Sequence, residues 1–331
     1  MAKNIVLVSL ALFQAMLTYM RYRNVHFVYS SVVRALNKTA DANQTFMIFN
    51  QVPKTGSENM IHLIDSLSFK NNFMNISSNP EFNQKYGYFH YFDEDLKRYY
   101  INMLLFPEIE SHQKIAYDKH MNFLNFEEFN RTNPIYVSMV RNPVERIISW
   151  YYYQRQTWYL TEMGHESDPT FYKETFEDCI WNEKEYCQFI PGNSIFTPSG
   201  IDTQMSQLSY YCGHGHECTL FGNADALKLA KSNVEKYYAV VGVLESMEET
   251  LRVLEQFVPD FFDGAVKVYR ASPRKKTNEN KQKPPVSWAI KQLLAKNMTH
   301  EIDFYEFCRQ RLYKQYLSLP INHNYDTLTL Q

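Results

Sequence analysis

An apolar run that passes through a short Lys-Thr-Gly-Ser loop into a helical pattern is the feature that most constrains the fold of this chain. Residues 46–49 have the composition of a buried strand, and residues 60–67 carry apolar side chains at helical spacing. A strand that turns directly into a helix directs the first helix N–H groups and the positive end of the dipole toward the loop. The loop, residues 54–57, is therefore predicted to bind an anion.

The same alternation of strand and helix signals continues along the chain. Two further segments, 134–140 and 239–243, are rich in apolar and β-branched residues, as buried strands are. Amphipathic helical patterns lie near 144–155, 223–237 and 246–258. This order predicts an α/β fold whose mainly parallel sheet is covered by helices, and such sheets bind ligands at the carboxyl ends of their strands.

Polar side chains follow two of these predicted strands. Residues 54–57 follow the first strand, Arg141 follows the second, and Ser149 lies two turns into the next helix. A lysine with backbone amides suits one phosphate-like group, and an arginine with a hydroxyl suits another. Taken separately, the motifs also fit a simpler interpretation, in which the lysine is solvated and Arg141 pairs with Glu145.

A nucleoside triphosphate site of the Walker type is a poor match to this loop. The Walker motif places glycines before its lysine and needs an acidic residue that holds magnesium. Here Lys54 precedes the single glycine of the loop. We therefore do not expect triphosphate hydrolysis.

The N-terminal segment predicts a membrane anchor. Residues 5–20 carry no charge and Arg21 follows them; a helix of that length spans roughly 24 Å, enough for a thin early-secretory bilayer. A cleaved signal peptide and a buried helix are the alternatives. We expect a signal anchor with a short cytoplasmic tail, a stem, a lumenal domain and a C-terminal tail, in residues 1–23, 24–45, 46–320 and 321–331.

Cysteine pairs and glycosylation sequons also indicate a lumenal, oxidising compartment. Cys179 with Cys187 and Cys212 with Cys218 are spaced for local disulfides, and Cys308 is left as a buried free thiol. Sequons for N-glycosylation occur at Asn37, Asn43, Asn75, Asn130 and Asn297.

The segment CGHGHEC offers a second interpretation, a zinc site made by Cys212, His214, His216 and Cys218. Four ligands that alternate along so short a segment leave too little chain to surround one ion tetrahedrally. A disulfide loop is therefore the preferred interpretation, and no metal is expected.

The charge balance limits the class of partner. A net charge of −2 and an isoelectric point near 6.6 argue against binding of nucleic acid over the surface at large. A basic cluster late in the chain is the exception, and it fits either an anion site or a solvated linker. Its members are Lys267, Arg270, Arg274, Lys275, Lys276, Lys281 and Lys283.

Several motifs, in order along the chain, resemble those of one enzyme family. They are VPKTGS with its preceding strand, PIYVSMVRNPVERIISWYYYQR, the two cysteine pairs and YYAVVGVLE. Together they resemble the uronosyl 2-O-sulfotransferases of the Golgi, the family that acts on heparan sulfate and on dermatan or chondroitin sulfate. The runs ISWYYYQRQTWY and KYYAVVGVLE are similar to the insect Pipe branch, and the resemblance covers residues 46–316.

The resemblance implies a P-loop-NTPase-like sulfotransferase fold and 3′-phosphoadenosine-5′-phosphosulfate (PAPS) as the sulfate donor. Three groups of residues match the family's donor site, namely its 5′-phosphosulfate loop, its 3′-phosphate site and a basic loop that closes over the nucleotide. In that order they are Lys54, Thr55, Gly56 and Ser57; Arg141 and Ser149; and Lys275, Lys276 and Thr277.

The resemblance also assigns catalytic roles. His120, in the run AYDKHMNFLNF, matches the family's general base, which takes the proton of the acceptor hydroxyl. Lys54 would neutralise the leaving phosphate oxygen while sulfate moves in line between two oxygens. An imidazole with its usual pKa of about 6.5 suits a mildly acidic lumen. Without the resemblance, a single histidine is more often a structural residue.

The family context further implies a single-pass type II Golgi membrane protein that sulfates the 2-hydroxyl of a uronic acid in a glycan and tends to form homo-oligomers. Four positions depart from the family pattern. Members commonly carry Arg where this chain has Gln51, Thr or Ser where it has Asn59, and Asp where it has Asn142. In addition, Glu58 places a carboxylate beside the expected sulfate. The alternative is a catalytically lapsed lumenal relative that binds glycan or nucleotide.

Overall fold

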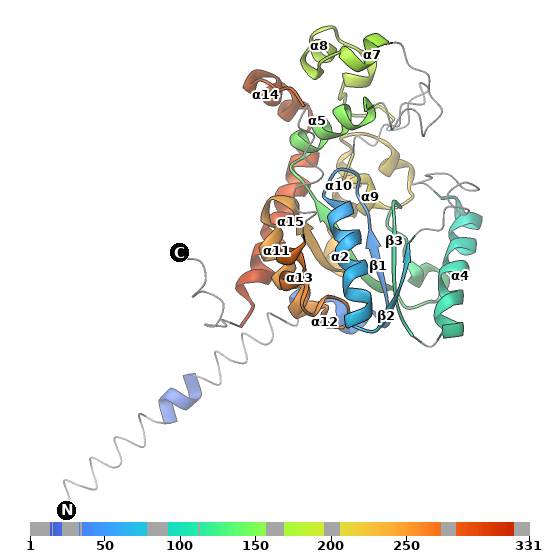
Figure 1. Cartoon of the computed structure of the whole chain (residues 1–331), viewed down its shortest axis with the longest axis vertical. Coiled ribbons are helices and arrows are strands. Elements are labelled where there is room, and N and C mark those ends of the chain that lie inside the picture. The colour runs from blue at the N-terminus through green and yellow to red at the C-terminus, as the bar shows by residue number, and fades with distance from the viewer. Residues whose placement is uncertain are drawn as a thin grey trace, which may run out of the picture.

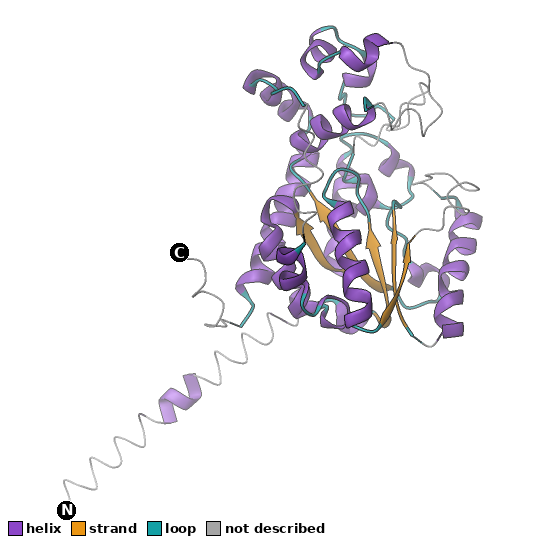
Figure 2. Ribbon diagram, in the orientation of Figure 1, coloured by secondary structure: helices purple, strands orange, loops and turns teal. Residues whose placement is uncertain are grey.

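The computed structural model describes residues 14, 16–21, 33, 35–77, 92–111, 113–156, 169–194, 206–272 and 283–320. Its centre is a five-stranded sheet flanked by helices (Figure 1). Neighbouring strands are parallel, so their carboxyl ends meet at one edge of the sheet (Figure 2). The predicted α/β class and parallel sheet are confirmed.

The order of the strands across the sheet is β2-β3-β1-β4-β5. Their bounds are Asn43–Asn50 (β1), Phe73–Ser77 (β2), Lys114–Lys119 (β3), Pro134–Val140 (β4) and Tyr238–Val243 (β5). All residues of β4 and β5 are buried, which explains their continuous apolar sequences. Because β1 has β3 on one side and β4 on the other, the chain changes direction across the sheet at β1. Ligands in open α/β sheets bind at such a point.

The residues that precede α2, α5 and α10 explain where these three helices begin. α2 (Ser57–Lys70) starts directly after Gly56. α5 (Pro143–Gln154) has proline at its first position, and the side chain of Asn142 accepts hydrogen bonds from two N–H groups of its first turn, at 3.1 and 3.2 Å. Asn223 caps α10 (Ala224–Tyr237) in the same way, at 2.9 and 3.0 Å.

The other described helices surround this centre. They are α4 (Glu94–Ser111), α7 (Pro169–Lys173), α8 (Phe176–Trp181), α9 (Ser209–Cys212), α11 (Met247–Phe257), α12 (Pro259–Phe262), α13 (Ala265–Ala271), α14 (Trp288–Asn297) and α15 (Thr299–Leu317). Short 3-10 helices lie at Thr39–Asp41, Phe126–Phe129, Glu185–Cys187, His216–Thr219 and Leu244–Ser246. α2 packs on α12 and α13, and α15 contacts β5, α10 and α11.

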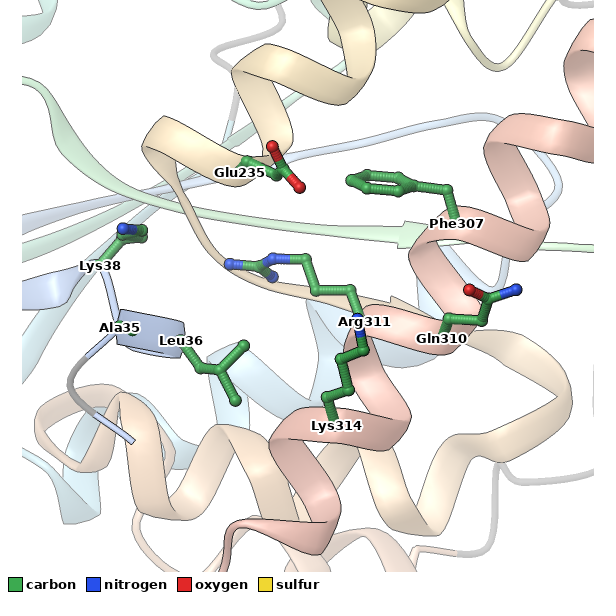
Figure 3. Close-up of a pocket in the computed structure, with 8 residues that line it drawn as sticks. All are labelled: Ala35, Leu36, Lys38, Glu235, Phe307, Gln310, Arg311 and Lys314. Carbon is green, nitrogen blue, oxygen red and sulfur yellow. The ribbon is translucent and has the colours of Figure 1, made fainter. Parts of the chain in front are cut away.

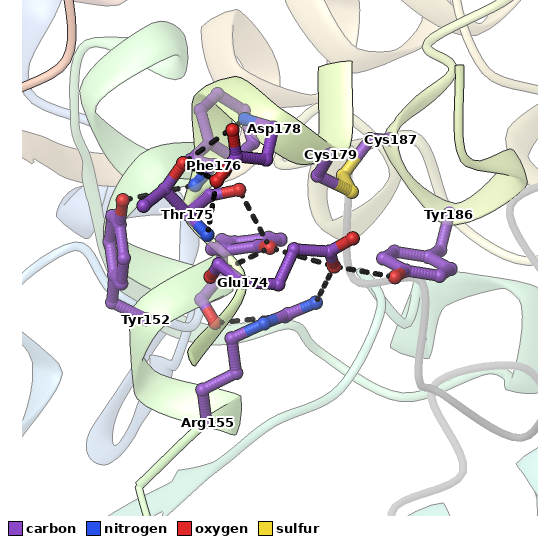
Figure 4. A network of polar contacts seen from close by, with 10 residues as sticks. Tyr152, Arg155, Glu174, Thr175, Phe176, Asp178, Cys179, Tyr186 and Cys187 are labelled. Carbon is purple, nitrogen blue, oxygen red and sulfur yellow. Dashed lines mark hydrogen bonds and ion pairs between the residues drawn. A yellow bond between two sulfur atoms is a disulfide. The ribbon is translucent and has the colours of Figure 1, made fainter. Parts of the chain in front are cut away.

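A second apolar cluster lies beyond the carboxyl ends of the strands, where α5, α8 and α14 meet. Arg155, at the end of α5, lies over the rings of Tyr151 and Phe171 at 3.4 and 4.0 Å. Its guanidinium pairs with Glu174 at 3.2 Å, and the Tyr186 hydroxyl donates to the same carboxylate at 2.7 Å (Figure 4). This polar network joins α5 to the segment that contains α7 and α8.

The cysteines pair as their spacing predicts. Disulfides join Cys179 to Cys187 and Cys212 to Cys218, and Cys308 is a buried free thiol. The pairing of Cys212 and Cys218 removes both thiolates from the zinc interpretation.

The first of the two histidines in that segment, His214, has a structural role. The ring of His214 stacks on Phe92 with the centroids 5.1 Å apart, and its Nδ1 accepts a hydrogen bond from the Phe92 N–H at 2.9 Å. Burial lowers the pKa of His214 to about 3, so the ring is neutral.

The predicted membrane anchor and the glycosylation sequons fall partly within the described residues. No helix in the described ranges is long and apolar enough to cross a membrane. Most of residues 5–20 lie outside those ranges, so the signal anchor stays a prediction. Two sequon asparagines, Asn130 and Asn297, are exposed, whereas the other three are partly buried.

A cavity of about 300 Å³ lies at the amino ends of the strands, between α10, α15 and the segment before β1 (Figure 3). Arg311 reaches into this region and donates to the carbonyl of Tyr238, the first residue of β5, at 2.7 Å. None of the predicted site residues lines the cavity. The polar site that the sequence predicts lies at the opposite end of the sheet.

Candidate active site

The carboxyl ends of four neighbouring strands supply the candidate site. β3 leads to His120, β1 leads to the loop of residues 51–56, β4 leads to Arg141, and β5 leads to Leu244 and Glu245. These residues are far apart in the sequence. The strand order brings them to one edge.

The loop after β1 has a backbone that requires glycine at one position. Gly56 has a φ of 89°, and a Cβ there would lie 2.7 Å from a methyl carbon of Leu244. Lys54 also has a positive φ, of 65°. This tight turn ends at Ser57, where the first turn of α2 presents N–H groups that have no acceptors within the helix.

Both hydroxyls of the loop are used inside it. The side chains of Thr55 and Ser57 donate to the carbonyl of Val52 at 2.8 and 2.7 Å. Their hydroxyl hydrogens are therefore directed at the protein. A contact of Thr55 or Ser57 with an anion would come from their backbone N–H groups, as in other helix N-terminal anion sites.

Lys54 is a partly buried cation without a close carboxylate partner. Its Nζ lies 3.8 Å from the centre of the Tyr153 ring, and among the described residues no carboxylate is within ion-pair distance. Burial lowers the pKa of Lys54 to about 8; Glu58 opposes this shift and Arg141 adds to it. An anion placed beside this ammonium would favour the charged form and raise the pKa again.

Arg141 connects the two halves of the site. Its Nη1 donates to the carbonyl of Lys54 at 3.2 Å. Burial lowers the pKa of Arg141, and the carboxylates of Glu245 and Glu145 oppose that shift. Because no ion pair involving Arg141 exists in the described part of the chain, this guanidinium is also suited to an external anion.

His120 is bonded to the start of the same loop. Its Nδ1 lies 3.1 Å from the carbonyl oxygen of Gln51. A carbonyl only accepts, so Nδ1 carries the proton in this contact and the lone pair lies on Nε2. The expected pKa near 6.5 is wrong, because burial, aided by Lys119 and opposed by the Gln51 contact, lowers the pKa of His120 to about 4. The ring is thus a neutral base throughout the mildly acidic range.

Two departures from the family pattern have a structural explanation. Gln51 is buried and donates from its Nε2 to the buried carboxylate of Asp118 at 2.8 Å. Asn142 caps α5, a role that aspartate also fills. The neutral cap keeps the helix start and places no negative charge next to Arg141.

The two remaining departures lie on the first turn of α2. Glu58 is exposed, and its charge acts on Lys54. Asn59 faces α13, where it lines a small pocket with Tyr269 and Ser272.

The predicted 3′-phosphate and closing-loop residues are placed only in part. Ser149 lies on α5, partly buried, two turns after Arg141. Glu145, on the same helix, pairs with Lys291 at 2.5 Å and with Lys283 at 3.8 Å. Lys275, Lys276 and Thr277 lie outside the described residues, so their role stays a prediction.

The basic cluster lies only partly within the described residues. Arg270 pairs with Glu248, away from the loop of residues 51–56. Arg274 and Lys281 fall outside the described ranges. Among the described members of the cluster, Arg270 and Lys283 are thus already paired with carboxylates.

Sequence reasoning missed several residues that contact the site. Tyr153 supports Lys54, and Glu245 accepts a hydrogen bond from the Asn142 N–H at 2.8 Å. The side chain of Gln207 accepts a hydrogen bond from the Arg141 N–H and donates one to the Arg141 carbonyl. Tyr153 could have been found, because it lies three turns after Arg141 in a helix already predicted; the others follow no motif.

Comparison with known proteins bears on this arrangement. The model described as "Sulfotransferase family" matches residues 38–308. The chain belongs to this sulfotransferase family. The sulfotransferase is 34% identical over 295 residues to the uronyl 2-sulfotransferase homolog pip of Drosophila melanogaster, an alignment that covers 86% of this chain and 55% of that protein. It thus spans about half the length of the Drosophila protein.

This sulfotransferase is also similar to heparan sulfate 2-O-sulfotransferases of other animals. It is 29% identical over 281 residues to heparan sulfate 2-O-sulfotransferase 1 of Xenopus laevis, with 82% of this chain and 71% of the relative covered. It is 30% identical over 250 residues to heparan sulfate 2-O-sulfotransferase hst-2 of Caenorhabditis elegans, with 72% and 70% covered. The resemblance read from the sequence is confirmed.

Proposed function

We propose that this enzyme transfers the sulfuryl group of PAPS to a 2-hydroxyl of a uronic acid in a glycan, as a type II membrane protein of the Golgi. One observation carries the proposal. Two partly buried cations without ion-pair partners in the described chain, Lys54 and Arg141, lie at the ends of adjacent strands, and a neutral His120 contacts the loop that contains Lys54.

The residues present fit such a donor. PAPS would supply an activated sulfuryl group and two phosphate sites. The loop of residues 54–57 would hold the 5′ side through Lys54 and the backbone N–H groups at the start of α2. Arg141 would hold the 3′-phosphate, and Ser149 lies on the helix that follows it.

His120 would act on the acceptor. The Gln51 carbonyl fixes the ring with its proton on Nδ1, so Nε2 is the atom that takes the acceptor hydroxyl proton. Lys54 would neutralise the charge that develops on the phosphate oxygen opposite. In an in-line transfer the base and the cation would act on opposite sides of the sulfuryl group.

The competing function is a lumenal protein that binds glycan or nucleotide without turnover. The exposed carboxylate of Glu58, whose charge acts on Lys54, is the observation that favours it. Incubation of the purified protein with sulfur-labelled PAPS and a panel of glycosaminoglycans separates the two functions. We expect labelled glycan; donor binding without transfer to any acceptor of the panel would favour the binding protein.

Replacement of Arg141 by alanine should lower the affinity of the protein for the donor nucleotide. We expect the Kd of adenosine 3′,5′-bisphosphate to rise about 10- to 100-fold, because a charge-assisted contact worth about 1.5–3 kcal/mol is lost. Isothermal titration calorimetry measures this change. Arg309→Ala, which removes an exposed arginine paired with Glu306, is the control and should leave the Kd unchanged. An unchanged Kd in Arg141→Ala would exclude Arg141 from the site.

A further inference from the structure

A buried carboxylate on α15 organises a segment that contacts Arg141. Glu301 is 1% exposed. It accepts hydrogen bonds from the Ser206 hydroxyl at 2.5 Å, from the Gln207 N–H at 3.1 Å and from the Leu208 N–H at 3.3 Å. Three donors that converge on one carboxylate fix the backbone of residues 206–208.

Gln207 carries this constraint to the donor site. Its side chain is fully buried and bonds to both backbone groups of Arg141. The Arg141 N–H donates to Oε1 at 3.2 Å, and Nε2 donates to the Arg141 carbonyl at 3.0 Å. The two bonds hold both of the peptide groups that flank the Arg141 Cα, between the end of β4 and the start of α5. The orientation of these two groups sets the direction in which the Arg141 side chain leaves the backbone.

The charge of Glu301 also acts on a buried arginine that contacts the loop after β1. Arg146, on α5, is fully buried, and its charge interacts with that of Glu301. The Nη1 of Arg146 donates to the carbonyl of Pro53, next to Lys54, at 3.4 Å. A buried guanidinium needs an opposing charge, because an unbalanced buried ion is strongly destabilising. The carboxylate therefore bears on the loop of residues 51–56 as well as on Arg141.

We propose that Glu301 and Gln207 are positioning residues for the donor nucleotide: Glu301 holds residues 206–208, and Gln207 in turn sets the backbone of Arg141. Neither side chain touches the donor. This inference rests on the proposed function, because it assigns Arg141 to the donor. It makes the last long helix, more than 150 residues after the strand-end arginine, a determinant of donor affinity.

The test compares two buried glutamines. Gln207→Met keeps the side-chain volume and the backbone N–H that Glu301 holds, but removes both bonds to Arg141. Gln315→Met is the matched control, because Gln315 is also fully buried and donates to two backbone carbonyls, Leu36 at 3.1 Å and Ala239 at 2.8 Å, at the far end of the sheet.

Both variants should lower the Tm by similar amounts, but only Gln207→Met should lower the affinity for the donor nucleotide. We expect its Kd for adenosine 3′,5′-bisphosphate to rise about 5- to 50-fold, with kcat at saturating PAPS within about twofold of the parent. A purely structural role predicts equal Kd values for the two variants. That outcome would overturn the inference.

A double-mutant cycle tests whether Glu301 acts through Gln207. Glu301→Gln keeps the size of the side chain but removes its charge, and it should also raise the Kd. If Glu301 acts mainly through Gln207, Glu301→Gln should raise the Kd by a smaller factor in the Gln207→Met protein than in the parent. Fully additive effects on the Kd would contradict the relay from α15.

Failure of this inference is distinguishable from failure of the proposed function. If the parent protein does not bind the bisphosphate, the donor site itself is wrong. If the parent binds it and Gln207→Met binds it equally well, the donor site stands and the positioning role is wrong.

Discussion

Sulfate transfer is expected to fall about 10²- to 10⁴-fold when His120 is replaced by alanine, the usual contribution of a general base. The affinity for adenosine 3′,5′-bisphosphate should stay near that of the parent, because a base contacts the acceptor proton and not the donor phosphates. The measurements are single-turnover transfer to a glycan acceptor and calorimetric binding of the bisphosphate. Together they separate loss of chemistry from loss of donor binding.

The chain offers a matched control for this variant. His214 is also buried, also neutral and also bonded through Nδ1, but it packs on Phe92 away from the loop of residues 51–56. His214→Ala should lower the Tm and leave transfer per folded molecule unchanged. A well-folded His120→Ala protein with normal turnover would refute the assignment of the base.

The pH dependence of transfer follows from the position of His120. The active form of the base is deprotonated, so its contribution falls as the pH drops through its pKa. With the pKa of the free enzyme at about 4, kcat/KM should be insensitive to this group between about pH 5.5 and 7.5. A fall in kcat/KM below about pH 6.5 that is absent from His120→Ala would contradict this expectation. It would show that the pKa of His120 is close to its ordinary value.

The central part of the fold could be predicted because several local signals agree there. In β1 with α2 and in β4 with α5, an apolar run meets a loop whose residues cap the next helix. β3 was missed, since Lys114, Asp118 and Lys119 interrupt its apolar pattern. Asp118 is buried there and accepts a hydrogen bond from Gln51, which is far away in the sequence.

The candidate site was predictable only in its parts. The loop of residues 54–57 and Arg141 each follow a recognisable strand, so local patterns found them. The proximity of His120 to that loop results from β3 pairing beside β1, and strand order is a tertiary property. Gln207 and Glu301 follow no local pattern, because their roles depend on hydrogen bonds between segments 94 residues apart.

Replacement of Lys54 by methionine should impair both chemistry and donor binding, which sets it apart from the histidine variant. Methionine keeps the apolar contact with Tyr153 and removes the charge. We expect kcat to fall about 10²- to 10³-fold, the usual effect of losing one charge-stabilising group, and the Kd of the bisphosphate to rise about 10-fold.

The pH dependence of donor binding identifies Lys54 independently of turnover. An anion binds the protonated amine, so the affinity of the parent for adenosine 3′,5′-bisphosphate should fall as the pH rises through the free-enzyme pKa of about 8, with proton uptake on binding. Lys119 is the necessary control, because burial lowers its pKa to about 8 as well. Lys54→Met should abolish the pH dependence and Lys119→Met should keep it. The reverse pattern would show that Lys119, at the end of β3, and not Lys54 is the cation that binds the nucleotide phosphate. The sulfuryl group would then leave from the side of the site on which β3 ends.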